Sequence, residues 1–145
     1  MGGGDELRSI LVVSHGSLAK GVCEAANMIY GELENVHYLC LEKDMGIETY
    51  KQNLEKLIEK ISDSDEIIVL ADLRGGSPFT KAVTLLSEKG LLSKSKVITG
   101  LNLPMLLSVL FINNDITEIE VGEIMNSAKE GISLFEVDTQ DNDEL

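Results

Sequence analysis

The fold is decided by the stretch IIVLADLRGGSP at residues 67–78. Its first five residues are apolar and rich in β-branched side chains, which is typical of a central strand covered on both faces of a parallel sheet. Residues 75–77 then turn the chain, and Ser77 followed by Pro78 indicates the start of a helix that Ser77 caps. Strand, turn and helix in this order predict one βα unit of a parallel sheet.

Strands and helices alternate on both sides of this unit. Apolar runs predict further strands at residues 10–13, 36–41, 96–100 and 133–137, and apolar residues at helical spacing predict helices at about 18–30, 47–61, 78–90, 105–111 and 118–131. Ser17 is expected to cap the first helix, and the spacing of Thr117 and Glu120 is that of a capping box. The order βαβαβαβααβ predicts an α/β fold whose mostly parallel sheet has helices on both faces, with the last strand antiparallel.

The composition limits the classes of protein to which this chain can belong. Its 145 residues predict one domain at residues 9–137, between a flexible lead-in at 1–8 and an acidic tail at 138–145. The net charge of −13 opposes binding to nucleic acid. No apolar stretch is long enough for a membrane span, and the scattered carboxylates predict solvated helix faces, with no metal or cofactor. Cys23 and Cys40 fit no disulfide or metal motif, which favours reduced thiols in a cytoplasmic protein.

A histidine stands where the first strand ends, in the sequence Ser14-His15-Gly16. Because the carboxyl ends of parallel strands meet at one edge of a sheet, His15, Asp72 and residues 75–77 are expected to lie close together. The Asp72 carboxylate could accept a hydrogen bond from one ring nitrogen of His15, which fixes the tautomer and makes the other nitrogen more nucleophilic. The alternative interpretation is that Asp72 only caps a turn or helix.

Gly75, Gly76 and Ser77 lead into a predicted helix N-terminus, where free backbone N–H groups bind phosphate. An oriented histidine nitrogen beside such a cradle predicts a phosphohistidine site, with His15 and Asp72 as its catalytic residues and Gly75, Gly76 and Ser77 as phosphate-binding residues. Arg74 could stabilise the phosphate or be a solvated loop residue. His37 alternates within the second strand and is interpreted as a residue of the sheet face.

Motifs of three other classes of α/β protein are missing from the sequence. A receiver domain needs an acidic cluster after its first strand, where this chain has Ser14-His15-Gly16. Neither glycine-rich nucleotide-binding motif occurs. The Gly-x-Ser-x-Gly motif of serine hydrolases does not occur either.

The chain resembles the enzyme IIA component of the mannose family of sugar phosphotransferase systems. The resemblance spans about residues 9–137 and rests on ILVVSHG at residues 10–16, on Asp72 with GGSPF at 75–79, and on NLPM at 102–105. It implies that His15 accepts phosphate from the phosphocarrier HPr on its Nε2 atom and passes it to the IIB component, while Asp72 orients the ring. It also implies that the chain acts indirectly, through the IIB component, with membrane IIC and IID components. The family resemblance further implies a cytoplasmic homodimer whose subunits exchange the strand at residues 133–137.

Two other functions remain open at this point. The phosphotransfer subunit of dihydroxyacetone kinase has a similar fold and a phosphohistidine, although the sequence Gly-Gly-Ser-Pro-Phe favours the mannose type. A regulatory or scaffold module without catalytic activity would use the apolar residues 105–111 as a docking surface.

Overall fold

A computed structural model describes residues 7–137. The elements are β1 (Arg8–His15), α1 (Leu18–Tyr30), β2 (Val36–Leu41), α2 (Ile47–Lys60), β3 (Glu66–Ala71), α3 (Ser77–Glu88), a 3₁₀ turn η2 (Leu92–Lys94), β4 (Ser95–Thr99), α4 (Leu103–Leu110) and α5 (Glu118–Glu130). The first strand thus begins within the segment that was expected to be a lead-in. Residues 1–6 of that lead-in and the expected acidic tail at 138–145 lie outside the described residues.

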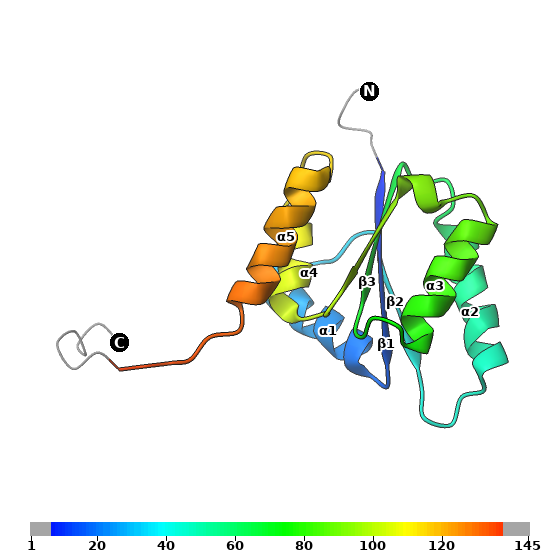
Figure 1. Ribbon diagram of the computed structural model, residues 1–145, viewed down its shortest axis with the longest axis horizontal. Helices are drawn as coiled ribbons and strands as arrows, with labels where there is room; N and C mark the ends of the chain where they lie inside the picture. The colour runs from blue at the N-terminus through cyan, green and yellow to red at the C-terminus, as the bar shows by residue number, and fades with distance from the viewer. Residues whose placement is uncertain (1–6, 138–145) are drawn as a thin grey trace.

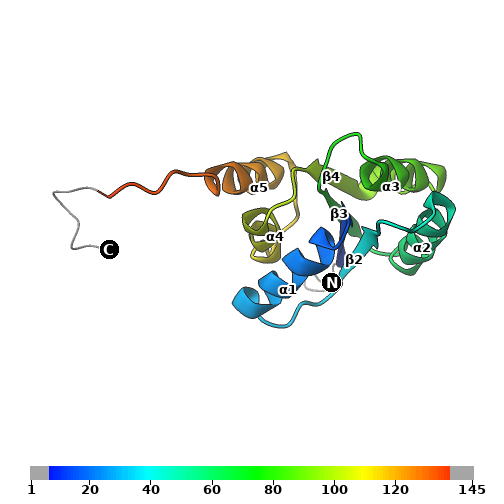
Figure 2. The same cartoon turned by 90° about the horizontal axis from the view of Figure 1, so that it is seen from below.

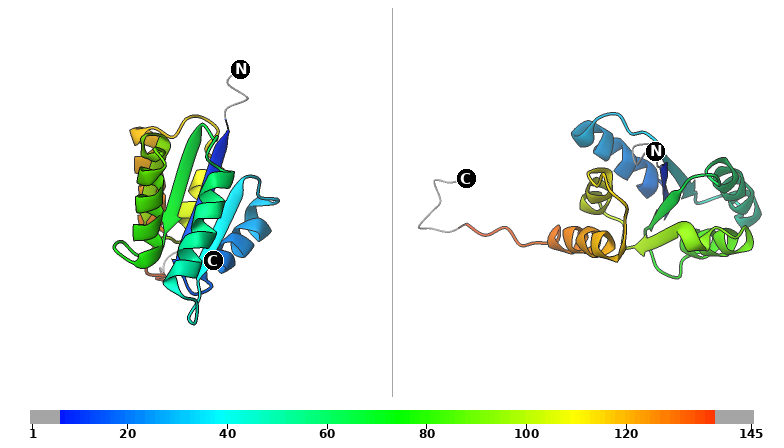
Figure 3. Two further views of the ribbon diagram at one scale, coloured as in Figure 1. Left: turned by 90° about the vertical axis from the view of Figure 1, so that its right-hand side faces the viewer. Right: turned by 90° about the horizontal axis from the view of Figure 1, so that it is seen from above.

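The four strands form one parallel sheet in the order β2-β1-β3-β4. Helices α1, α4 and α5 cover one face, and α2 and α3 cover the other (Figures 1 and 2). Figure 3 shows the same two layers of helices from the side and from above. The α/β class, the parallel sheet and the helices on both faces that the sequence predicts are therefore confirmed. No helix among residues 7–137 is long and apolar enough to cross a membrane.

The two central strands send alternate side chains into two separate cores. Val12 and Leu70 pack with α1, α4 and α5, whereas Val13 and Ala71 pack with α2 and α3. All six residues of β3 are buried, so this strand reads as a continuous apolar run because neither of its faces meets water. Cys23 packs in the first of these cores, where burial raises the pKa of its thiol to about 11.

The ends of the helices differ in part from the sequence-based expectations. Ser77 is the first residue of α3 rather than its cap, because Gly76 occupies the capping position with an extended backbone. Ser17 precedes α1 but makes no capping hydrogen bond with its side chain. The predicted capping box of α5 is present, and the hydrogen bonds from Thr117 lower the pKa of Glu120 to about 2.

The terminal strand expected at residues 133–137 does not form in the single chain. These residues have no regular secondary structure, and they extend from the end of α5 away from the body of the molecule (Figure 1). Leu134 is 81% exposed and Phe135 is 70% exposed. An apolar segment gains no stability from such exposure, and no strand in the described part of the chain pairs with it.

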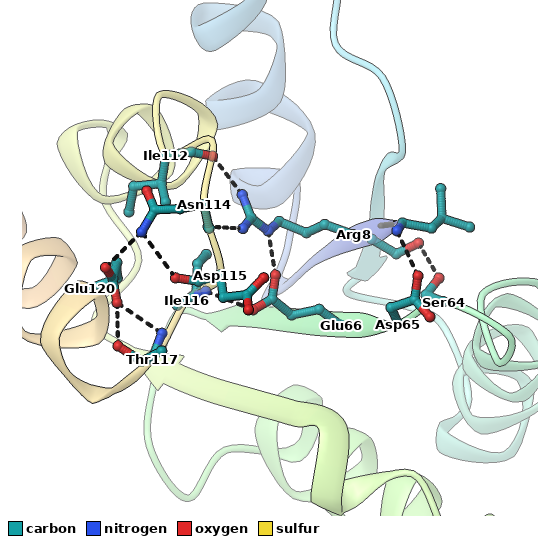
Figure 4. A network of polar contacts seen from close by, with 12 residues as sticks. Arg8, Ser64, Asp65, Glu66, Ile112, Asn114, Asp115, Ile116, Thr117 and Glu120 are labelled. Carbon is teal, nitrogen blue, oxygen red and sulfur yellow. Dashed lines mark hydrogen bonds and ion pairs between the residues drawn. The ribbon is translucent and has the colours of Figure 1, made fainter. Parts of the chain in front are cut away.

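Figure 4 shows a polar network around Arg8 and Glu66. These residues begin β1 and β3, at the end of the sheet opposite to His15. The guanidinium of Arg8 donates to Glu66 Oε1 at 2.6 Å and to the carbonyl oxygens of Ile112 and Asn114. The second carboxylate oxygen of Glu66 accepts from the N–H of Ile116 at 2.8 Å. Because Glu66 is buried, this pair fastens the loop between α4 and α5 to the sheet.

Replacing Glu66 with alanine should destabilise the fold by about 3–5 kcal/mol, the usual effect of removing one partner of a buried ion pair. The variant leaves the Arg8 charge and the Ile116 N–H without their partner. Urea unfolding followed by circular dichroism measures the change. Lys89→Ala, which removes a cation that pairs with Glu55 and Glu59 at the surface, is the control and should change the free energy of unfolding far less. Equal effects of the two substitutions would contradict the structural role of the Glu66 network.

Candidate functional site

The strand order reverses between β1 and β3, and His15 and Asp72 lie at that point. From β1 the chain continues to β2, which lies next to β1 in the sheet, and then crosses to β3, which lies next to β1 on its opposite edge. The connecting helices consequently leave on opposite faces, which opens a crevice at the carboxyl ends of the two strands. His15 is the last residue of β1, and Asp72 directly follows β3. Open α/β sheets bind their ligands at this position.

His15 and Asp72 are in direct contact, as the sequence predicts. The Nδ1 atom of the His15 ring lies 2.9 Å from Asp72 Oδ2, and the same oxygen accepts the backbone N–H of His15 at 2.9 Å. The His15 side chain is 46% exposed, whereas that of Asp72 is only 13% exposed. The histidine is therefore held by a mostly buried carboxylate while it remains open to solvent.

This contact determines which nitrogen of His15 is free to react. An ionised carboxylate can only accept hydrogen bonds, so Nδ1 carries the proton and donates to Asp72. The lone pair then resides on Nε2, which has the character of a nucleophile. Positive charge that develops on the ring when Nε2 forms a bond is stabilised by the carboxylate at Nδ1.

Gly76 lies against the ring of His15, a role that its motif alone did not indicate. A Cβ atom at Gly76 would lie 2.6 Å from His15 Cε1 and 3.3 Å from Nε2. Real carbon atoms do not approach so closely, so any larger residue would push the ring out of position. Gly75 is required for a different reason, because its φ of +86° is favourable only for glycine.

The predicted phosphate cradle is only partly available. The N–H of Gly76 donates to the carbonyl oxygen of Leu73 at 3.1 Å and closes the turn. Pro78 has no N–H, which leaves the amides of Ser77 and Phe79 at the start of α3 without a hydrogen bond among the described residues. Because Nε2 of His15 faces Gly76, an anion bound to that nitrogen would lie beside this helix N-terminus.

The loop that carries His15 is fixed by Ser14 and Gly16, whose roles the sequence does not predict. Ser14 is fully buried, and its Oγ accepts the N–H of Ala19 at 2.7 Å. It thus satisfies the first turn of α1 in place of the expected cap, Ser17. Gly16 has a φ of +56° and donates to Leu41 of the neighbouring strand β2 at 2.8 Å. The feature of the sequence that could have indicated this cap is the small hydroxyl residue Ser14 directly before His15-Gly16.

Neither the second histidine nor a metal-binding cluster adds to this site. His37 lies inside β2 and pairs with Leu11, as expected of a sheet residue. Residues 7–137 contain no group of three or more His, Cys, Asp or Glu side chains placed to hold a metal ion. Arg74 is exposed. The chemistry that the site offers is that of one oriented imidazole beside a helix N-terminus.

The family model and the curated relatives described next are phosphotransferase system components. The family model described as PTS system fructose IIA component matches residues 9–129. The PTS system fructose-specific EIIA component of Bacillus subtilis is 26% identical over 83% of this chain and 79% of the relative. The PTS system mannose-specific EIIAB component of Escherichia coli is 28% identical over 88% of this chain, but only 39% of that longer protein is covered.

Solved structures show the same fold. The PTS IIA protein associated with the fucose utilization operon of Streptococcus pneumoniae superimposes with a TM-score of 0.75 at 34% identity, over 92% of this chain and 96% of that one. The phosphotransferase system component EIIA of Streptococcus agalactiae gives a TM-score of 0.71 at 30% identity, over 88% of this chain and 97% of that one. A mannose/sorbose-specific IIA subunit from Enterococcus faecalis, at 21% identity and a TM-score of 0.77 over 91% of this chain and 97% of that one, shows likeness of fold alone.

Proposed function

This chain belongs to the EIIA-man family of phosphotransferase system IIA components, and we propose that it carries a phosphoryl group on His15 between two proteins of a sugar phosphotransferase system. The donor is the phosphocarrier HPr, and the acceptor is a IIB component that works with membrane IIC and IID components. The observation that carries the proposal is the exposed His15 ring whose Nδ1 is fixed by Asp72 at 2.9 Å. The proposed location is the cytoplasm, where the donor phosphocarrier would be met.

In this proposal, phosphoryl transfer uses the His15 ring, the Asp72 carboxylate and the amides at the start of α3. The lone pair of Nε2 attacks the phosphorus of phospho-HPr, the P–N bond of the donor breaks, and the donor nitrogen leaves with that electron pair. The Nδ1 proton stays on His15, where Asp72 stabilises the phosphorylated ring. The free amides of Ser77 and Phe79 would bind the phosphoryl oxygens. Attack of a IIB nucleophile on the same phosphorus reverses the bond changes and regenerates His15.

The surface around His15 suits a partner protein. Beside the His15 loop lies a hollow of about 620 Å³ whose lining includes Gly16, Lys20, Tyr38 and Lys43. Lys20 and Lys43 outnumber Glu42, the carboxylate of this lining, and this local excess of positive charge favours an acidic or phosphorylated partner surface. A carrier must receive and donate its group in turn, and an open surface allows both partners to dock.

The alternative of a scaffold module loses its expected docking surface. Met105, Leu106 and Val109 of α4 are buried in the core against α1 and α5. The apolar residues of this helix therefore stabilise the fold rather than forming an exposed patch, although Phe111 at its end is exposed.

A reconstituted relay tests the proposed function. The purified chain is incubated with labelled phosphoenolpyruvate, the general phosphotransferase enzyme I and HPr, and then with a IIB component of the mannose family. We expect label that is stable in base and labile in acid, as phosphohistidine is, and its loss when the IIB component is added. A chain that remains unlabelled when HPr is fully phosphorylated would overturn the proposal, and label that passes only to dihydroxyacetone kinase subunits would support that alternative.

We also propose that two copies of the chain form a homodimer by exchanging residues 133–137 as a strand. The outer edge of β4 has no partner strand among the described residues. Beside it lies a groove of about 400 Å³ whose lining includes Val97, Met105, Met125 and Ile132. The exposed apolar segment that contains Leu134 and Phe135 starts at this groove, and a second copy would supply both the strand and the apolar side chains that the edge lacks.

Replacing Leu134 and Phe135 together with aspartate should convert the dimer to a monomer. Because neighbouring residues of a strand point to opposite faces of the sheet, replacing both residues ensures that one charge would have to be buried in the groove of the partner copy, which is costly without a counter-charge. Light scattering coupled to size-exclusion chromatography measures the mass. Because both positions are exposed in the single chain, the monomer should keep its circular dichroism spectrum. A variant that stays dimeric, or a parent chain that is monomeric, would contradict the exchange.

A further inference from the structure

One oxygen of the Asp72 carboxylate has no described hydrogen bond. Asp72 Oδ2 accepts both the His15 ring and the His15 backbone N–H, whereas Oδ1 is buried and without a hydrogen-bond partner. A buried carboxylate oxygen left in this state is costly. The orientation of the carboxylate is also fixed only by its hydrogen bonds to His15, which is the residue that Asp72 has to position.

A second buried polar atom without a partner is the hydroxyl of Tyr50. Tyr50 is fully buried and lies in the first turn of α2, at the same edge of the sheet as His15, because α2 follows the carboxyl end of β2. Its side chain belongs to the core that contains Val13, which precedes His15 by two residues, and Ala71, which precedes Asp72. The two unpartnered oxygens therefore occupy the same end of one apolar cluster.

The electrostatics agree with this placement. Burial raises the pKa of the Tyr50 hydroxyl, and the next largest cause is the charge of Asp72, followed by Cys40. The hydroxyl consequently keeps its proton and remains a hydrogen-bond donor. The Tyr50 hydroxyl is thus a hydrogen-bond donor close enough to interact with the Asp72 charge, and a donor is what Asp72 Oδ1 lacks.

We propose that Tyr50 is a positioning residue for the phosphoryl carrier, and that its hydroxyl is linked to Asp72 Oδ1 through one bridging water molecule. No direct hydrogen bond joins the two atoms, and a single water between two buried polar groups satisfies both. The link holds the carboxylate from the side opposite His15, and thereby fixes the angle at which Nδ1–H meets Oδ2. This inference rests on the proposed function of His15 only for its effect on the rate.

Tyr50→Phe tests the proposal, because it removes the hydroxyl and leaves the ring in the core. We expect phosphoryl transfer from HPr to slow about tenfold, the scale on which groups behind a reacting residue act. In addition, the ¹⁵N resonances of the His15 ring in the unphosphorylated protein should move towards a mixture of the two tautomers. The midpoint of urea unfolding should change little, because the removed hydroxyl has no direct protein partner.

Two controls separate this role from a merely structural one. Tyr30→Phe removes a hydroxyl at the far end of α1 and should change neither the rate nor the His15 resonances. In an Asp72→Asn background, Tyr50→Phe should have much less than its tenfold effect, because the two residues act through one carboxylate. Unchanged His15 resonances in Tyr50→Phe would overturn the inference, whether or not the chain proves to be a phosphoryl carrier. Equal effects of Tyr50→Phe with and without Asp72 would overturn it too.

Discussion

His15→Ala should abolish phosphorylation of this chain by phospho-HPr, with a loss of at least about 1,000-fold in transfer rate, because the only proposed nucleophile is removed. The substitution should not disturb the fold. The His15 side chain is nearly half exposed, and the backbone N–H of residue 15 still donates to Asp72 Oδ2 after the ring is gone. Acid-labile label, measured after incubation with labelled phosphoenolpyruvate, enzyme I and HPr, reports the result.

The other histidine of the chain supplies the matched control. His37→Gln changes a partly buried residue within β2 and should leave labelling unchanged. Circular dichroism and the unfolding midpoint of both variants show whether either substitution affects folding. Label on folded His15→Ala, or its loss from folded His37→Gln, would contradict the assignment of the phosphorylated residue.

The sheet could be predicted from the sequence because its strands follow directly from burial. β3 is buried on both faces and reads as an uninterrupted apolar run, and α2 shows its single buried face as helical spacing. The segment at residues 133–137 contains Leu134, Phe135 and Val137, and the same pattern predicts a strand there. A strand also needs a partner for its backbone groups, and that partner is not encoded in the local sequence. The single chain consequently leaves this segment extended and exposed.

The contact between His15 and Asp72 was also predictable, since both residues end neighbouring parallel strands. The fine structure of the site was not. Capping of α1 by Ser14 rather than Ser17 depends on a backbone turn at Gly16. Helix α3 begins at Ser77, one residue before the predicted start at Pro78. The motif Gly75-Gly76 suggested backbone flexibility and phosphate binding, but the space required by a neighbouring ring does not appear in a sequence.

That close approach leads to the second large expected effect: Gly76→Ala should slow phosphoryl transfer about 100-fold. The added methyl group would lie 2.6 Å from His15 Cε1, so the ring must rotate or shift. Either movement lengthens the contact with Asp72 Oδ2 or turns Nε2 away from the start of α3, and misplacement of a reacting atom by about 1 Å can cost a factor of this size. Gly76 has a φ of −75°, which alanine adopts without strain. The fold should therefore survive, and the loss should arise from the position of the ring.

Gly122→Ala is the matched control, because a Cβ atom at that position in α5 meets no other atom within 4 Å. It should leave the transfer rate unchanged and stabilise the protein slightly, as replacement of an unstrained helical glycine does. Transfer rates are compared by rapid quench, and the ¹⁵N resonances of the His15 ring report its hydrogen bond to Asp72. A Gly76→Ala variant with normal rates and unchanged His15 resonances would show that the ring is not confined by this glycine. A slow variant with a displaced ring resonance would show that a single hydrogen atom in place of a methyl group keeps Nε2 in line for transfer.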